Sequence, residues 1–170
     1  LFLLAYLSKA SALMYLAVFP LVLVIFRDVN YKKITVIVLS ALVVALVVRY
    51  APRLFLPSPS RPILFVENPL LFEDNKWLHV STGFSVLLFY LKQLIWPSTL
   101  LFYYGYDMIP VVNFANAEVI ASVVIHAGLL ALAVYYFRKK PIISFAVLFY
   151  FISIAMYTNM VKPVMGIVAD

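Results

Sequence analysis

The chain has 170 residues, of which 66% are hydrophobic and 12% are charged, and its formal net charge at pH 7 is +6. Soluble domains are about 45–50% apolar and about 25% charged, so this composition excludes an ordinary soluble domain and indicates that lipid surrounds much of the chain. The basic residues are scattered between apolar segments, which argues against nucleic-acid binding. The absence of cysteine excludes disulfides, cysteine-bound metals and thiol nucleophiles.

Three apolar helices are predicted in the first third of the chain, over residues 1–7, 12–26 and 34–48. Polar residues at 8–11 separate the first two helices, and a short basic loop containing Arg27, Lys32 and Lys33 separates the second from the third. The third helix is short for a hydrocarbon core about 30 Å thick, because a helix rises only about 1.5 Å per residue. We therefore expect its flanking residues to reach the membrane surface.

The middle of the chain combines proline-rich loops with one amphipathic helix. Five prolines between residues 50 and 75 exclude a regular helix there. Asp74 or Asn75 offers an N-cap for a helix over 76–96, which Pro97 ends. Its polar residues fall on one arc of the helix and its apolar residues on the other. The polar arc contains His79, Thr82, Ser85, Lys92 and Gln93.

Two further apolar helices are predicted over residues 117–137 and 141–157, with the basic residues 138–140 between them. Asn116 is the candidate cap of the first, and Glu118 lies in its first turn. The pattern as a whole predicts an all-α, polytopic membrane protein that forms one membrane domain over residues 1–170. Because both ends of the chain are apolar, we expect this domain to be a fragment of a longer protein.

The short basic loops predict how the chain is oriented. The positive-inside rule assigns both of them to the cytoplasm, so residues 50–116 are expected on the non-cytoplasmic side at both of their ends. The amphipathic helix over 76–96 cannot then cross the membrane once. We expect it to be interfacial or re-entrant.

Several motifs carry a resemblance to a known family. The pattern Leu7-Ser8-Lys9-Ala10-Ser11-Ala12 opens an apolar helix. The other motifs are Phe65-Val66-Glu67-Asn68-Pro69, Leu91-Lys92-Gln93-Leu94 with Pro97, Tyr103-Tyr104-Gly105-Tyr106-Asp107 with Ile109-Pro110, and Thr158-Asn159 with residues 166–170. Together they resemble bacterial, Bacteroidetes-type membrane proteins with C-terminal tetratricopeptide repeats, which are relatives of the TMTC protein O-mannosyltransferases of the endoplasmic reticulum.

This resemblance implies a GT-C fold and a polyprenyl-phosphate-linked sugar as the donor. Such enzymes usually carry their catalytic Asp or Glu in the first non-cytoplasmic loop, which we expect upstream of Leu1. The family often has Glu after the Ser-Lys pair, where this chain has Ala10. We therefore do not transfer the role of the family's Glu to this position of the chain.

The candidate substrate-binding or lipid-phosphate-binding residues fall in these motifs. Lys9 is expected to bind the lipid phosphate, with a membrane-surface lysine that ends a helix as the alternative. Glu67 and Asn68 are expected to bind sugar hydroxyls or the acceptor, although Asn-Pro is also an ordinary turn signal. An aromatic sugar or lipid platform with a carboxylate nearby is expected from Tyr103, Tyr104, Tyr106 and Asp107, with an interfacial aromatic belt as the alternative. Asn159 matches a family position, but it can also simply cap a loop.

The predicted function is transfer of a sugar from a polyprenyl-phosphate donor to protein or glycan on the non-cytoplasmic face. The alternative is a non-catalytic scaffold, or a lipid-linked-sugar transporter, in an envelope complex. We predict no metal site and no cofactor, because the two histidines form no ligand motif. The expected location is the bacterial inner membrane, or the endoplasmic reticulum in a eukaryote.

Overall fold

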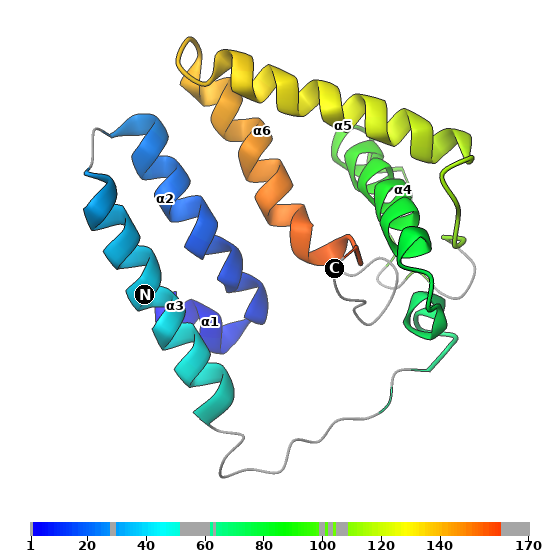
Figure 1. Cartoon of the computed structure of the whole chain (residues 1–170), viewed down its shortest axis with the longest axis horizontal. Coiled ribbons are helices and arrows are strands. Elements are labelled where there is room, and N and C mark those ends of the chain that lie inside the picture. The colour runs from blue at the N-terminus through cyan, green and yellow to red at the C-terminus, as the bar shows by residue number, and fades with distance from the viewer. Residues whose placement is uncertain are drawn as a thin grey trace. The chain divides into compact units, whose positions relative to one another are not determined.

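The computed structural model describes residues 2–27, 30–51, 62, 64–98, 101, 104 and 109–160. Within these residues the secondary structure is entirely helical, with α-helices joined by short 3₁₀ turns (Figure 1). The chain divides into two compact units. The first unit contains residues 1–60 and 130–153, and the second contains residues 61–129 and 154–170.

The first unit is built from apolar helices at the start of the chain. Helix α1 (Phe2–Ser8) is followed by the 3₁₀ helix η1 (Ala10–Met14) and by α2 (Tyr15–Phe26). Helix α3 (Tyr31–Tyr50) returns beside α2 (Figure 1). A small core of Tyr6, Ala12 and Ala45 joins α1, η1 and α3. Helix α6 (Pro141–Ile154) meets the end of α2 through an edge-to-face contact between Phe26 and Phe145, whose ring centroids are 5.5 Å apart.

Helix α3 is longer than the sequence predicted. It has 20 residues, which corresponds to about 30 Å and matches the hydrocarbon thickness of a bilayer. The expectation of a short helix over 34–48 is therefore wrong. The reason lies at its start, where the side chain of Asn30 accepts a hydrogen bond from the Lys32 amide at 2.9 Å. This cap brings Lys32 and Lys33 into the first turn of the helix.

The second unit contains the 3₁₀ helix η3 (Pro69–Phe72), α4 (Lys76–Ile95) and the first part of α5 (Ala117–Tyr136). The Asn75 side chain caps α4 by accepting from the Trp77 amide at 3.0 Å. Asn116 caps α5 by accepting from the Glu118 amide at 2.8 Å, as the sequence predicted. The 3₁₀ turn η4 (Ala155–Tyr157) continues α6 and leads to the last described residues.

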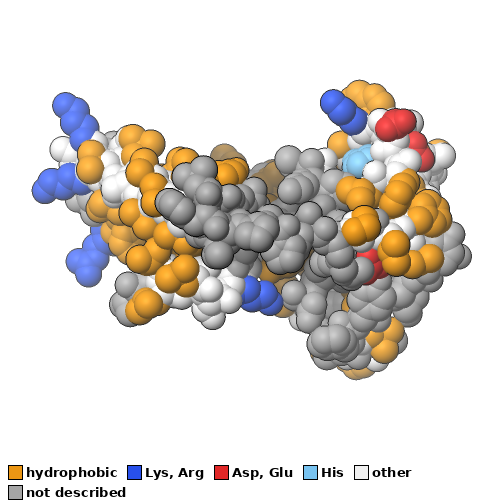
Figure 2. Space-filling view, turned by 90° about the horizontal axis from the view of Figure 1, so that it is seen from below, with side chains coloured by type: hydrophobic (Ala, Val, Ile, Leu, Met, Phe, Trp, Pro, Cys, Tyr) orange, Lys and Arg blue, Asp and Glu red, His pale blue; other side chains and the backbone are white. Residues whose placement is uncertain are grey.

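The fold buries both polar and apolar side chains, and many large apolar side chains lie on its surface. Helix α4 buries Ser81, Thr82 and Ser85 together with Val86, Leu87 and Leu88, while Leu94 and Ile95 are exposed. On the face drawn in Figure 2, hydrophobic side chains form much of the described surface and charged side chains are few. Helices α4 and α5 are each long and apolar enough to cross a membrane. Large exposed apolar side chains are expected of a surface that contacts lipid or another protein.

Candidate functional site

Two residues that the sequence marked as candidate site residues meet inside the second unit. Asn68 Nδ2 donates to Asn159 Oδ1 at 3.1 Å, and Asn68 Oδ1 accepts from the Leu70 amide at 3.0 Å. Both asparagine side chains are fully buried. Because an unpaired buried amide is costly, this contact fixes the start of η3 against the turn that follows η4. The geometry thus gives Asn68 and Asn159 a positioning role.

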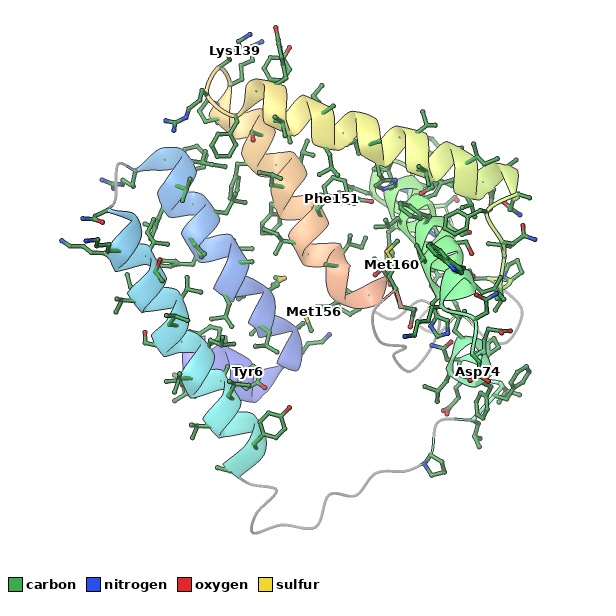
Figure 3. All side chains as sticks on the ribbon, viewed as in Figure 1. Tyr6, Asp74, Lys139, Phe151, Met156 and Met160 are labelled. Carbon is green, nitrogen blue, oxygen red and sulfur yellow. The ribbon has the colours of Figure 1, made fainter. Side chains whose placement is uncertain are left out.

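A close approach of α4 to the same turn reinforces this contact. Gly83 of α4 lies against Met160 and against the carbonyl oxygen of Thr158. Figure 3 shows Met160 beside α4. Thr158 is buried, and its hydroxyl donates to the carbonyl of Ala155 at 3.1 Å. The segment Thr158-Asn159, which the resemblance singled out, is therefore held by α4 on one side and by Asn68 on the other.

Buried hydroxyls connect α4 to its other neighbours. Ser81 Oγ lies 2.6 Å from the carbonyl oxygen of Val112, and Thr82 Oγ1 accepts from the Val112 amide at 3.1 Å. Ser122 of α5 donates to the carbonyl of Phe84 at 2.5 Å. His126 Nδ1 lies 2.8 Å from the Ser122 carbonyl oxygen and 3.2 Å from Ser122 Oγ. His126 is buried, and its ring has hydrogen-bond partners within its own helix.

The remaining candidates of the second unit take different positions. Glu67 accepts from the Leu64 amide at 2.8 Å and closes a turn. Tyr104 is half-buried, and its ring packs edge-to-face on Phe89 with centroids 5.0 Å apart. Tyr103, Tyr106 and Asp107 lie outside the described residues. Substrate contact by these five residues stays a prediction.

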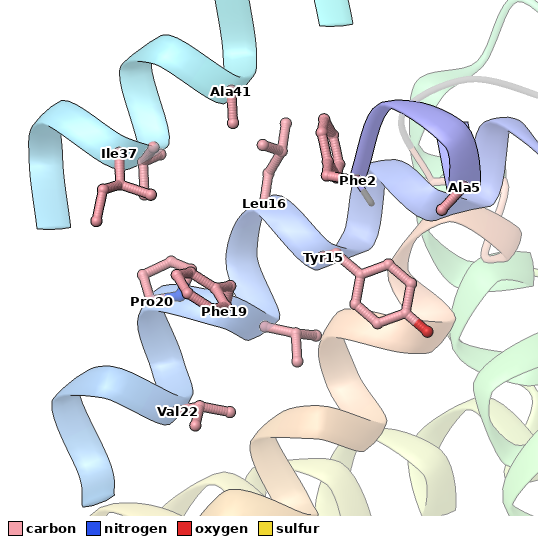
Figure 4. Close-up of a pocket in the computed structure, with 11 residues that line it drawn as sticks. Phe2, Ala5, Tyr15, Leu16, Phe19, Pro20, Val22, Ile37 and Ala41 are labelled. Carbon is pink, nitrogen blue, oxygen red and sulfur yellow. The ribbon is translucent and has the colours of Figure 1, made fainter. Parts of the chain in front are cut away.

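Lys9 belongs to the first unit, where it separates α1 from η1 in an extended conformation. Its side chain is exposed, and its amide donates to the carbonyl of Ala5 at 3.0 Å. Ala5 lines a pocket of about 560 Å³ formed by α1, α2 and α3 (Figure 4). The pocket is lined almost entirely by apolar atoms, which come from residues such as Phe2, Leu16 and Ile37. The backbone of Lys9 is therefore bonded to a residue that lines this apolar pocket.

Two smaller pockets among the described residues of the second unit share Ile109 and Pro110. One, of about 280 Å³, adjoins η3 and includes Glu73. The other, of about 220 Å³, lies between α4 and the start of α5, where Lys92 Nζ donates to Glu118 Oε1 at 2.8 Å. The sequence placed Lys92 on a polar arc and Glu118 in a first turn. A spacing of 26 residues gave no signal that the two side chains would meet.

No family model, no curated protein and no solved structure matches this chain. Among the described residues, no three His, Asp or Glu side chains gather in a group that could hold a metal ion. The residues of the site are therefore the basis for assigning its chemistry.

Proposed function

We propose that this chain belongs to a polytopic membrane glycosyltransferase of the GT-C type, which transfers a sugar from a polyprenyl-phosphate donor to protein or glycan. The observation that carries the proposal is the apolar pocket lined by Ala5, whose carbonyl oxygen accepts from the Lys9 amide. A polyprenyl phosphate combines a long apolar chain with an anionic headgroup. An apolar groove with a cation at its edge suits both parts, because the ammonium group can bind the phosphate oxygens.

The proposed reaction is displacement at the anomeric carbon. A hydroxyl oxygen of the acceptor forms a bond to this carbon, and the bond from the carbon to the phosphate oxygen breaks with its electron pair. A carboxylate takes the proton of the acceptor hydroxyl. Lys9 stabilises the negative charge that develops on the leaving phosphate. The buried contact between Asn68 and Asn159 supports the same proposal, because it joins two segments that the resemblance singled out.

The test uses the full-length protein in lipid nanodiscs with a radiolabelled polyprenyl-phosphate hexose and a peptide acceptor. We expect label in the peptide, and about tenfold or greater loss with Lys9→Ala, since a hydrogen bond to a charged group contributes about 1.5–3 kcal/mol. Lys33→Ala is the matched control, because Lys33 is also exposed in the first unit. If the donor crosses the bilayer of a vesicle but no sugar is transferred to the peptide, the protein is a transporter. A protein that does neither is a scaffold.

A further inference from the structure

The pocket between α4 and α5 in the second unit has the composition of a ligand site rather than of a packing defect. It is lined by Ser85, Phe89, Lys92, Ile109, Pro110 and Glu118. Three of these residues carry polar side chains of different kinds: a hydroxyl, an ammonium and a carboxylate. One carries an aromatic ring. None of the six is among the residues that the family resemblance assigned to substrate.

Ser85 provides the first argument. Its side chain is only 8% exposed, and it lines the pocket. Within the part of the chain that the structure describes, no hydrogen bond involves its hydroxyl. The neighbouring hydroxyls of Ser81 and Thr82 are both paired with Val112. Ser85 Oγ is not one of the buried polar atoms that lack a partner, so this hydroxyl is accessible from the pocket, where an occupant with polar groups can bind it.

The ion pair defines the charge of that occupant. Lys92 and Glu118 are in contact at 2.8 Å, so the charges that line the pocket sum to zero. An anionic ligand is repelled by Glu118, and a cationic ligand is repelled by Lys92. Both side chains are 59% exposed and retain further donor and acceptor capacity, because an ammonium has three N–H groups and a carboxylate has two oxygens. The pair therefore suits a neutral ligand that both donates and accepts hydrogen bonds.

Size and shape narrow the class of ligand. A volume of about 220 Å³ lies below the roughly 300–1,000 Å³ of pockets that take drug-sized ligands. One small ring fits. The ring of Phe89 offers an apolar face beside these polar groups, a combination that matches the C–H face and the hydroxyl rim of a pyranose.

We propose that Ser85, Lys92 and Glu118 form a subsite for one neutral sugar ring, with its apolar face on Phe89. This inference deepens the proposed function, in which a sugar is transferred, but binding at the subsite does not require the transfer reaction. A hydroxyl of the sugar accepts from Lys92, a second donates to Glu118, and a third pairs with the hydroxyl of Ser85.

The test is saturation-transfer NMR on the full-length protein in detergent. The neutral probes are the methyl α-glycosides of glucose, mannose and galactose, and the charged probes are glucose 6-phosphate and glucosamine. We expect at least one neutral probe to bind saturably and more tightly than either charged probe. Ser85→Ala should weaken its binding about two- to tenfold, as expected for one lost hydrogen bond. Ser40→Ala, an exposed serine of α3, is the matched control and should bind as the wild type does.

Glu118→Gln gives a readout that loss of folding cannot imitate. It leaves the positive charge of Lys92 without its counter-charge, so binding should shift from the neutral probe toward glucose 6-phosphate. The subsite is refuted if no neutral probe binds, if Ser85→Ala binds as the wild type does, or if Glu118→Gln leaves the preference unchanged. Sugar binding that depends on Ser85, in a protein without transferase activity, refutes the proposed function alone. Transfer without such binding refutes the subsite alone.

Discussion

Gly83 of α4 and Met160 approach each other so closely that a Cβ atom on Gly83 would overlap Cγ of Met160. The same Cβ atom would lie 2.9 Å from the carbonyl oxygen of Thr158. Glycine at this position therefore allows a backbone carbonyl to lie directly against a helix. Small residues permit the same close approach between helices in membranes.

Gly83→Ala should destabilise the protein by about 1–3 kcal/mol, because the added methyl group requires the turn at residues 158–160 to move. Gly128→Ala is the matched control. A Cβ atom on Gly128 meets no atom within 4 Å, and alanine favours a helix over glycine by about 1 kcal/mol. Thermal unfolding in detergent should rank Gly128→Ala at or above the wild type and Gly83→Ala well below it.

A double-mutant cycle tests whether the overlap with Met160 causes the loss of stability in Gly83→Ala. Met160→Ala removes the overlap with Met160 but leaves the Thr158 carbonyl in place, so it should rescue part of the loss caused by Gly83→Ala. If the losses of the two single variants simply add, the contact between Gly83 and Met160 does not determine the effect.

Asn159 combines its contact with Asn68 and an unusual backbone conformation. Its φ of 58° lies in the left-handed region, which costs most other residues roughly 1–2 kcal/mol. Asn159→Gly keeps this conformation accessible and removes only the side-chain contacts. Asn159→Ala removes the contacts and adds the backbone cost. We therefore expect both variants to unfold at lower temperature, with the alanine variant about 1–2 kcal/mol less stable than the glycine variant.

Ser122→Ala tests the contact between α4 and α5. The variant leaves the carbonyl of Phe84 without the hydroxyl that lies 2.5 Å away, and it should cost about 1–2 kcal/mol. Ser40→Ala removes a hydroxyl that bonds only to its own helix, at the Ile37 carbonyl, and should cost less than about 0.5 kcal/mol. Equal unfolding temperatures for the two variants would contradict a special role for the contact between the helices.

Much of the helical framework could be predicted from the sequence, because it depends on local signals. Asn75 and Asn116 each lie directly before an apolar helix, and each accepts the backbone hydrogen bond expected of a cap. The cap at Asn30 gives a weaker signal, because the basic residues that follow it are typical of a loop. In the structure Lys32 and Lys33 occupy the first turn of α3.

The candidate site could be predicted only in part, because long-range contacts leave no periodic signal. Asn68 and Asn159 were identified separately through the resemblance, but no spacing rule predicts contact between residues 91 positions apart. Ser85 was assigned to a polar arc together with Thr82, and nothing in the sequence separates the hydroxyl that is paired from the one that is not. That distinction depends on where Val112 and Glu118 lie in the fold.

The ion pair between Lys92 and Glu118 should contribute little to stability. Exposed pairs typically contribute about 0–1 kcal/mol, and each side chain here is 59% exposed. A cycle of Lys92→Ala, Glu118→Ala and the double variant should therefore give a coupling energy below about 1 kcal/mol, which falls further in high salt. A much larger value would mean that the pair is a structural element, and that ligand binding cannot easily compete for its groups.

The last prediction concerns the solvent around α5. Val124 is 66% exposed, which is costly in water and favourable in lipid. The chain has no cysteine, so Val124→Cys introduces a single thiol, and Lys139→Cys in the turn after α5 is the matched control. In vesicles permeabilised so that the reagent reaches both faces of the membrane, a charged maleimide should label Lys139→Cys rapidly and Val124→Cys very slowly, because hydrocarbon disfavours the reactive thiolate and excludes the reagent. After unfolding in detergent the two thiols should react alike. Equal labelling rates in the vesicles, before unfolding, would show that this face of α5 contacts water, and the membrane assignment of the helix would be wrong.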